Sequence, residues 1–142
     1  MSKLYSILSF YSHSDCNGPS IDYSNVTLCH QNIRSIKGKE KLLHIKTELA
    51  NNYDIIALSE TWLSDGDKTE DYLLKGYQVP HRRDRSFGVE GYGGVMVWVS
   101  DKIACKRRKD LEIADIEAMW LEVRTANKKN FSMCHISIRF KY

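Results

Sequence analysis

Two polar side chains in this 142-residue sequence stand just after short apolar runs, and their types suit metal and phosphate chemistry. Glu60 follows the run Ile55–Leu58 after one serine, and Asn32 comes directly after the run Val26–Gln31. A carboxylate and an amide supply the oxygen ligands that hard divalent cations prefer, and both groups can contact a phosphate. Asn32 and Glu60 are therefore the first candidates for a catalytic site.

Two strands and one helix would have to place these side chains. The runs Val26–Gln31 and Ile55–Leu58 are each typical of a short strand, and the second is apolar enough to be buried on both faces. Between them, Lys39–Asn51 is predicted to be helical, because apolar residues recur at helical spacing, as at Leu42 and Ile45. In such a βαβ unit the two strands are parallel, and ligands bind at the carboxyl ends of the strands.

The rest of the chain predicts a meander of strands with short turns. Strands are expected at Gly76–Pro80, Val95–Val99, Ile103–Lys106, Ala118–Arg124 and Phe131–Ile138. The segment Asn127–Asn130 predicts a hairpin turn between the last two. Residues 1–24 are serine-rich and contain the turn signal Asn17-Gly18-Pro19, so they are predicted to be a poorly ordered leader before one domain at residues 25–142.

The polar segments after the first two strands resemble a known family. Asn32-Ile33-Arg34-Ser35 followed by Ser59-Glu60-Thr61-Trp62 is similar to the opening of an endonuclease/exonuclease/phosphatase domain, in the variant carried by non-LTR retrotransposons. Further matches follow in the same order at Gly76-Tyr77, Arg83-Asp84-Arg85, Gly93-Gly94 and Trp120–Arg124. The resemblance runs from about Val26 to Ile138.

The resemblance implies an α/β fold that is part of a DNase I-like four-layer sandwich. The chain would supply about one mixed sheet with its helical cover, the amino-terminal part of the domain. An apolar surface that includes Val95–Val99 and the Cys134, Ile136 and Ile138 face of the last strand is then expected to lie uncovered in water.

The resemblance also implies roles for the two strand-end residues. Glu60 would bind the magnesium ion that polarises the scissile phosphate, and Asn32 would hydrogen-bond to the phosphate or to the catalytic network. Magnesium binding is expected to be weak, because one carboxylate supplies few of the ligands. The alternatives are a Glu60 that caps a turn or pairs with an arginine, and an Asn32 that simply begins a loop.

Arginines near these segments are candidates for DNA contacts. Arg34 stands where repair-type relatives carry an acidic residue or glycine, and this difference points to the retrotransposon branch. Arg82, Arg83 and Arg85 surround Asp84, and guanidinium groups suit phosphate oxygens. The alternative is a solvated cluster in which Asp84 pairs with one arginine. DNA is accordingly one expected partner.

Two motifs that the family uses for hydrolysis do not occur in these 142 residues. No Ser-Asp pair is followed by histidine, and the single D-x-N, Asp15-Cys16-Asn17, precedes the first predicted strand and is typical of a turn. The resemblance therefore implies that the groups that activate and orient water are absent. We expect a truncated or decayed endonuclease domain that is inactive alone, with the remainder of the domain as a further expected partner. The alternative is a non-catalytic nucleic-acid-binding or interaction protein derived from that fold.

Composition sets the remaining limits. The net charge of +3 is too small to indicate nucleic-acid binding by itself. No apolar run approaches the roughly 20 residues of a membrane span, so no membrane partner is expected. Four cysteines without C-x-x-C spacing favour a reducing, intracellular setting, nuclear or cytoplasmic, over secretion.

Overall fold

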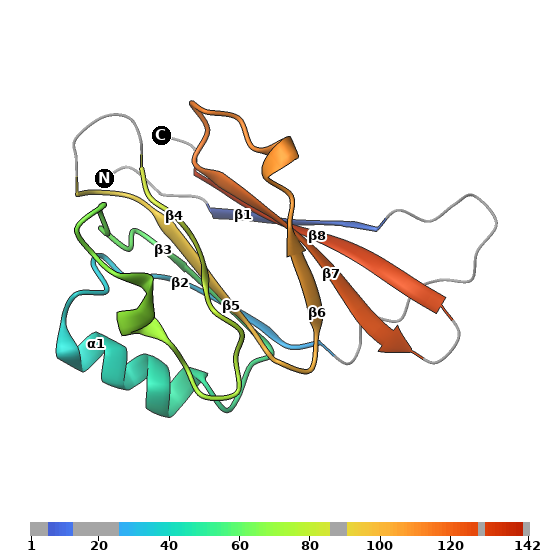
Figure 1. The fold of residues 1–142 in the computed structure, drawn as a ribbon, viewed down its shortest axis with the longest axis horizontal. Helices are drawn as coiled ribbons and strands as arrows, with labels where there is room; N and C mark the ends of the chain where they lie inside the picture. The colour runs from blue at the N-terminus through green and yellow to red at the C-terminus, as the bar shows by residue number, and fades with distance from the viewer. Residues whose placement is uncertain (1–5, 13–25, 86–90, 128–129, 141–142) are drawn as a thin grey trace. The chain divides into compact units, whose positions relative to one another are not determined.

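The computed structural model describes the backbone of residues 6–12, 26–85, 91–127 and 130–140, and the side chains of residues 26–85 and 91–123. The chain divides into two compact units (Figure 1). One unit is Val26–Asp101, and the other combines the described parts of Met1–Asn25 and Lys102–Tyr142. Each unit holds one four-stranded sheet, and the predicted α/β class is confirmed.

The Val26–Asp101 unit contains the predicted βαβ arrangement. Its strands are β2 (Leu28–Asn32), β3 (Ile55–Ser59), β4 (His81–Arg83) and β5 (Val95–Val99). In space their order is β2-β3-β5-β4, with β2 parallel to β3 and with β5 antiparallel to both of its neighbours. The sheet is therefore mixed, as predicted, and the carboxyl ends of β2 and β3 lie at the same edge.

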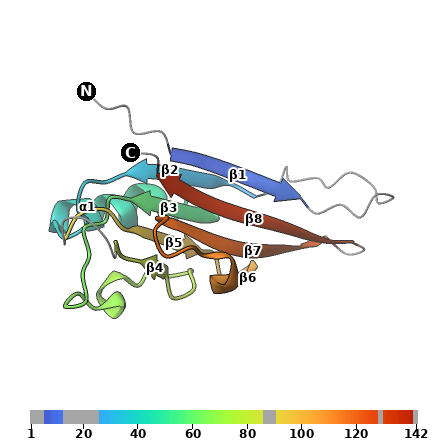
Figure 2. The ribbon, with the colours of Figure 1, turned by 90° about the horizontal axis from the view of Figure 1, so that it is seen from above.

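The connection between β2 and β3 is helical, as predicted, and it packs against one face of the sheet (Figure 2). Helix α1 (Lys39–His44) continues directly into a π-helical turn, Ile45–Leu49, in which the Ala50 N–H donates to the Ile45 carbonyl at 2.9 Å. A buried cluster joins the helix to the sheet. Its members are Ile36, Ile45, Leu49, Ile56, Leu58, Leu63, Tyr72, Leu74, Met96 and Trp98. None of the helices within the described ranges is long and apolar enough to cross a membrane.

The two central strands are buried on both faces. Every residue of β3 and of β5 is buried, which explains why both strands are near-continuous apolar runs instead of alternating patterns. The expectation that Val95–Val99 would lie uncovered in water is wrong, because these residues are at most 1% exposed. The apolar character of β5 therefore reflects burial within this fold.

The predicted strand at Gly76–Pro80 is displaced along the chain. Tyr77 forms a single antiparallel bridge with Ser100, and the continuous ladder with β5 begins at His81, where β4 starts. Pro80 has no N–H group to donate to a ladder, so regular pairing resumes after it. As a result, Arg82 and Arg83 belong to strand β4.

The second unit holds β1 and the three strands that follow Asp101, so the chain has a second sheet in addition to the predicted mixed one. Its strands are β1 (Ser6–Ser12), β6 (Ala104–Arg107), β7 (Ala118–Asn127) and β8 (Asn130–Phe140), in the spatial order β1-β8-β7-β6. All three pairings are antiparallel. The predicted hairpin is confirmed by the register of β7 and β8, in which Asn127 pairs with Asn130.

The first strand of this sheet comes from the segment predicted to be a poorly ordered leader. Ser6–Ser12 pairs with β8 along its whole length, from Ser6 opposite Phe140 to Ser12 opposite Cys134. Seven residues of the predicted leader thus form a strand in the structure. The sequence Ser-Ile-Leu-Ser-Phe-Tyr-Ser has the apolar and aromatic content of a strand, which its serines obscured. The rest of residues 1–24 lies outside the described residues.

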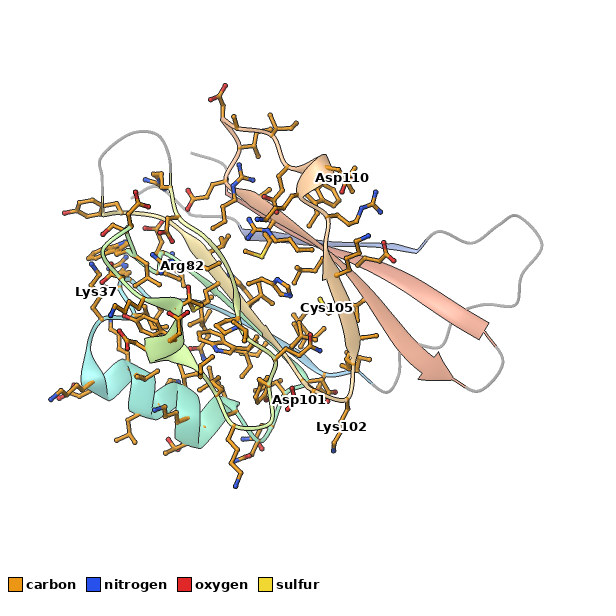
Figure 3. The ribbon with its side chains drawn as sticks, viewed as in Figure 1. Lys37, Arg82, Asp101, Lys102, Cys105 and Asp110 are labelled. Carbon is orange, nitrogen blue, oxygen red and sulfur yellow. The ribbon has the colours of Figure 1, made fainter. Side chains whose placement is uncertain are left out.

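The basic run Lys106–Lys109 stands at the end of β6. Its two arginines pair with carboxylates from later in the chain. Arg107 donates two hydrogen bonds to the Glu112 carboxylate, at 2.8 and 2.9 Å. Arg108 pairs with Asp110 at 2.6 Å and with Glu122 at 3.2 Å. Asp110 lies just after β6 (Figure 3), and its hydrogen bond from Arg108 lowers its pKa. Both arginines of this run are therefore engaged in ion pairs with carboxylates.

We expect the buried cluster to dominate the stability of the fold. Leu58 is fully buried in β3, so Leu58→Ala should lower the free energy of unfolding by about 2–5 kcal/mol through lost burial and an unfilled cavity. Leu43 on α1 is 60% exposed, so the same substitution there should change it by less than about 0.5 kcal/mol. Chemical denaturation of the two variants measures both effects. Equal losses would contradict the assignment of the core.

Candidate active site

The carboxyl ends of β2 and β3 bring the two leading candidates to one edge of the sheet. Asn32 is the last residue of β2 and pairs with Ser59, the last residue of β3. Glu60 follows immediately. Asn32 is exposed and Glu60 is half-buried, so both can be reached from that edge. The sequence predicted this juxtaposition from the two strand ends, and the structure has it.

The segment after β2 continues to pair with the segment after β3 beyond the ends of the strands. The Ile33 N–H donates to the Ser59 carbonyl at 3.0 Å, and the Ser35 N–H donates to the Glu60 carbonyl at 2.7 Å. Both backbones leave extended geometry here, yet they remain hydrogen-bonded. The loop after β2 therefore holds one side of the chain at Glu60.

The Gly93-Gly94 segment before β5 holds the other side. The Thr61 N–H donates to the Gly94 carbonyl at 3.3 Å, and the Trp62 N–H donates to the Gly93 carbonyl at 2.8 Å. The turn that carries Glu60 is thus fixed by hydrogen bonds from two directions. We call residues 60–62, with these flanking bonds, the clasped turn.

The clasped turn contains strained backbone. Glu60 and Trp62 have φ values of 56° and 58°, and across the edge Arg34 and Ser35 have φ values of 46° and 76°. A left-handed conformation costs a residue with a side chain roughly 1–2 kcal/mol. Such strain persists where the surrounding structure fixes it, and it concentrates at functional sites. Four residues with positive φ at one edge therefore make this region a candidate site.

Two glycines allow the close approach of the chain to the clasped turn. A Cβ atom on Gly94, whose φ is +88°, would lie 2.5 Å from the Thr61 hydroxyl oxygen. A Cβ atom on Gly93, whose φ is +69°, would lie 2.3 Å from Nε of Arg85. Neither position accommodates a side chain without displacing its neighbour. Steric contacts therefore explain why glycine is required at both positions of this pair.

The Glu60 carboxylate is oriented by donors on one oxygen. Oε2 accepts a hydrogen bond from the Trp62 indole Nε1 at 2.9 Å and one from the Gly93 N–H at 3.3 Å. Oε1 lies 3.7 Å from Nη2 of Arg85, an ion-pair distance. The predicted alternative, pairing of Glu60 with an arginine, thus coexists with a carboxylate whose direction is fixed by other groups.

Trp62 and Gly93 are contributors to which sequence reasoning gave no role. The sequence does contain features that could have indicated these roles. A tryptophan stands two positions after Glu60, and a glycine pair precedes β5. The Trp62 ring also packs against Tyr92, with ring centroids 4.8 Å apart and planes tilted by 57°. Tyr92 is 48% exposed, so an aromatic surface lies directly beside the carboxylate.

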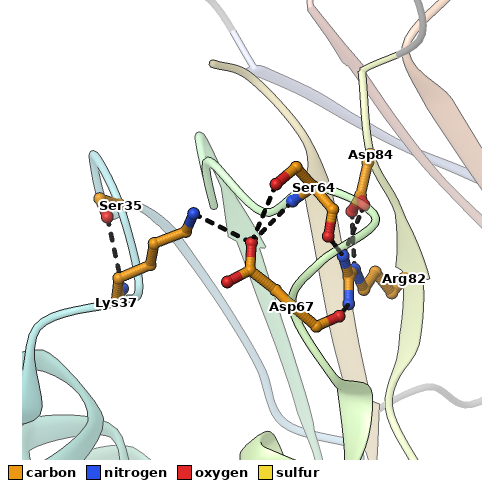
Figure 4. A network of polar contacts seen from close by, with 6 residues as sticks. All are labelled: Ser35, Lys37, Ser64, Asp67, Arg82 and Asp84. Carbon is orange, nitrogen blue, oxygen red and sulfur yellow. Dashed lines mark hydrogen bonds and ion pairs between the residues drawn. The ribbon is translucent and has the colours of Figure 1, made fainter. Parts of the chain in front are cut away.

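Arg82 is engaged in the structure of the loop before β4 (Figure 4). Its guanidinium forms a two-bond pair with Asp84, at 2.7 and 2.6 Å, and these bonds raise the arginine pKa. It also donates to the carbonyls of Asp67 at 2.5 Å and Ser64 at 2.6 Å. A phosphate contact by Arg82 would have to displace these partners.

The same loop is tied to the segment after β2. Lys37 pairs with the Asp67 carboxylate at 2.9 Å, and the Ser64 N–H and hydroxyl donate to the same oxygen, Oδ2. Burial alone would raise the Asp67 pKa, but the hydrogen bonds from Lys37 and Ser64 together lower it. Asp67 is therefore ionised near neutral pH and connects two loops at this edge.

The remaining predicted arginines occupy different environments. Arg34 is exposed and directly follows the strained edge beside Asn32. Arg83 is half-buried in β4, and Arg85 lies against Glu60 with 12% of its side chain exposed. The structure therefore places Arg34 and Arg85 near the clasped turn and assigns Arg82 to loop packing.

Comparison with known proteins agrees with this geometry. The model of the endonuclease/exonuclease/phosphatase family matches residues 29–136, about three quarters of the chain. The chain belongs to this family. A search of curated proteins gave no match. The matched range covers both units of the fold and includes Asn32, Glu60 and the glycine pair.

The family generally uses divalent metal ions, and Glu60 fits such an ion as a single ligand. Its Oε2 is held by two donors, as outer-shell groups hold metal-binding carboxylates, while Oε1 lies 3.7 Å from Nη2 of Arg85. Within the described residues no three His, Cys, Asp or Glu side chains group together to hold a metal. Magnesium, which keeps several waters and takes one or two carboxylates, is compatible with so small a ligand set.

We expect Gly94 to be essential for the clasped turn. Gly94→Ala adds a Cβ at positive φ and only 2.5 Å from the Thr61 hydroxyl, so it should lower the free energy of unfolding by about 2–4 kcal/mol. Gly66→Ala is the control, because a Cβ there meets nothing within 4 Å. Thermal melts of both variants measure the difference. Adding Thr61→Ala should recover the steric part of the loss, and an unaltered melt of Gly94→Ala would contradict the clasp.

Proposed function

We propose that this chain carries the metal- and phosphate-binding half of a retrotransposon-type endonuclease site, and that it does not cleave DNA by itself. The observation that carries the proposal is the Glu60 carboxylate, which is fixed through Oε2 at an accessible strand edge beside Asn32. A structural carboxylate at the surface does not require such orientation. A metal-binding carboxylate does, because ligand direction sets affinity.

The residues of the chain would divide the work as follows. Glu60 holds a magnesium ion, which would supply charge stabilisation at the phosphate. Asn32, at the adjacent strand end, donates its amide N–H to a phosphate oxygen. Trp62 and Gly93 keep the Glu60 carboxylate in one direction, so that less ordering is needed when the ion binds.

Hydrolysis needs more than these groups. An attacking water must lose a proton to a base and must be oriented, and the family assigns these tasks to its Ser-Asp-His and D-x-N motifs. Neither motif occurs in a suitable place in the printed sequence. The lack of a base supports the proposal that binding is retained and catalysis is not, whether the domain is truncated, decayed or completed by a separate remainder.

DNA is the proposed partner, and Arg34 and Arg85 are its proposed contacts near the clasped turn. Arg82 contributes indirectly by holding the loop at Ser64 and Asp67. A purely binding protein derived from this fold is the second candidate, and the exposed position of Arg34 favours it. An intracellular location is proposed as well, since the four cysteines of the sequence include no C-x-x-C pair.

Magnesium should bind weakly and through Glu60. Titration with magnesium chloride should shift the NMR signal of the Trp62 indole N–H, because that group donates to the Glu60 carboxylate. Glu60→Gln should abolish the shift, since an amide is a far poorer ligand for a hard cation. Glu70→Gln, at an exposed position of the 3-10 turn Thr69–Tyr72, is the matched control and should behave as the wild type. Unchanged binding by Glu60→Gln would remove Glu60 from the site.

Supercoiled plasmid should remain uncut in the presence of the purified chain and magnesium. The expected reason is the missing base, because general base catalysis contributes typically 10²–10⁴-fold to such reactions. Agarose gels of supercoiled and nicked forms provide the measurement, with DNase I as the positive control. Nicking by the wild type that is lost in Glu60→Ala would show that other residues replace the missing motifs, and the proposal of inactivity would be wrong.

A further inference from the structure

The Glu60 carboxylate is contacted on three sides by groups from three separate segments. Trp62 approaches Oε2 from the clasped turn, and Gly93 approaches the same oxygen from the segment before β5. Arg85, two residues after the end of β4, approaches Oε1. The first two contacts are hydrogen bonds to neutral donors, and the third brings a positive charge. The two oxygens of the carboxylate therefore have different environments.

Arg85 rests on a surface that only glycine provides. A Cβ on Gly93 would lie 2.3 Å from Nε and 2.5 Å from Cζ of Arg85, so the guanidinium packs directly over the Gly93 backbone. The Gly93 N–H meanwhile donates to Glu60. One glycine thus positions both members of the ion pair, and its missing side chain is what allows their approach.

A divalent cation bound by Glu60 would compete with Arg85. Oε1 is the oxygen that Trp62 and Gly93 leave for a ligand, and it is the oxygen that Arg85 faces. Two positive charges at one oxygen repel each other, strongly so where only 12–13% of either side chain is exposed. The distance of 3.7 Å between Nη2 and Oε1 is longer than a hydrogen bond, so this contact is an ion pair without a direct hydrogen bond.

We propose that Arg85 is the counter-ion of Glu60 in the metal-free protein, and that it gives up Oε1 when a divalent cation binds and then binds a phosphate of DNA. This inference rests on the proposed metal-binding role of Glu60. The guanidinium has the planar donor geometry that suits phosphate oxygens, and it would be released beside the place where Glu60 and Asn32 receive the phosphate. Arg85 is then a positioning residue that couples cation binding to DNA binding.

The first consequence is a higher cation affinity when the arginine charge is removed. In Arg85→Gln, isothermal titration with magnesium chloride at constant ionic strength should show about two- to fivefold tighter binding, the range for loss of a partly exposed ion pair. The carboxylate should keep its direction in this variant, because Trp62 and Gly93 hold the other oxygen. Lys46→Gln removes an equal charge from an exposed position of the helix and should leave the affinity unchanged.

The second consequence appears in DNA binding. Fluorescence anisotropy with a short labelled duplex should show that Arg85→Gln weakens binding about tenfold or more in magnesium, which is the effect of losing a hydrogen bond to a charged group. In EDTA the same substitution should change binding less than twofold, because Arg85 then faces Glu60 instead of DNA. Equal losses in magnesium and in EDTA would overturn the exchange, since the arginine would contact DNA in either state.

The Glu60→Gln variant separates failure of this inference from failure of the proposed function. If Glu60→Gln binds magnesium as the wild type does, Glu60 is not the ligand and both proposals are wrong. If Glu60→Gln loses binding while Arg85→Gln binds magnesium no more tightly than the wild type, the exchange alone is wrong. If Arg85→Gln does not fold, the exchange can be tested in the wild-type protein by NMR. Its Arg85 Nε–H NMR signal should move on magnesium addition, and a stationary signal would overturn the proposal.

Discussion

The clasped turn at Glu60 is the constraint on which the rest of this edge depends. Its backbone is strained at Glu60 and Trp62, and it remains in place because the loop after β2 and the Gly93-Gly94 segment hydrogen-bond to it from opposite sides. The strain also turns the Trp62 indole back toward the preceding carboxylate. The strained backbone of the turn costs folding free energy. Burial of the adjoining strands β3 and β5 offsets that cost.

A second theme is that arginine and carboxylate charges neutralise one another locally. Arg82 pairs with Asp84, Arg107 with Glu112, and Arg108 with both Asp110 and Glu122. The modest net charge of +3 is thus not concentrated in one basic stripe among the described side chains. Recognition of a polyanion by this chain would be local, through a few arginines that exchange partners, more than through long-range attraction.

The sequence allowed the juxtaposition of Asn32 and Glu60 to be predicted better than the arrangement of strands in the two sheets. Asn32 and Glu60 could be located because apolar runs end just before them, a signal that depends on neighbours in the chain. The place of β1 could not be predicted. Its serines obscured the strand pattern, and its partner β8 lies far away in the sequence. The position of β4 was missed because Pro80 stops regular pairing until His81, and the contacts of Trp62 depend on a φ angle that residue types do not reveal.

The pairing of β1 with β8 has a consequence for how the chain acquires its structure. Ser6 and Phe140 are opposite each other although almost the whole chain separates them, so this ladder must close a very large loop. Pairings at such sequence separation form slowly, and during synthesis β1 cannot form its described ladder until β8 has left the ribosome. Until then the edge of β1 is open to pairing with other chains. The parallel pairing of β2 with β3 is much more local, so we expect the edge that carries Glu60 to form first.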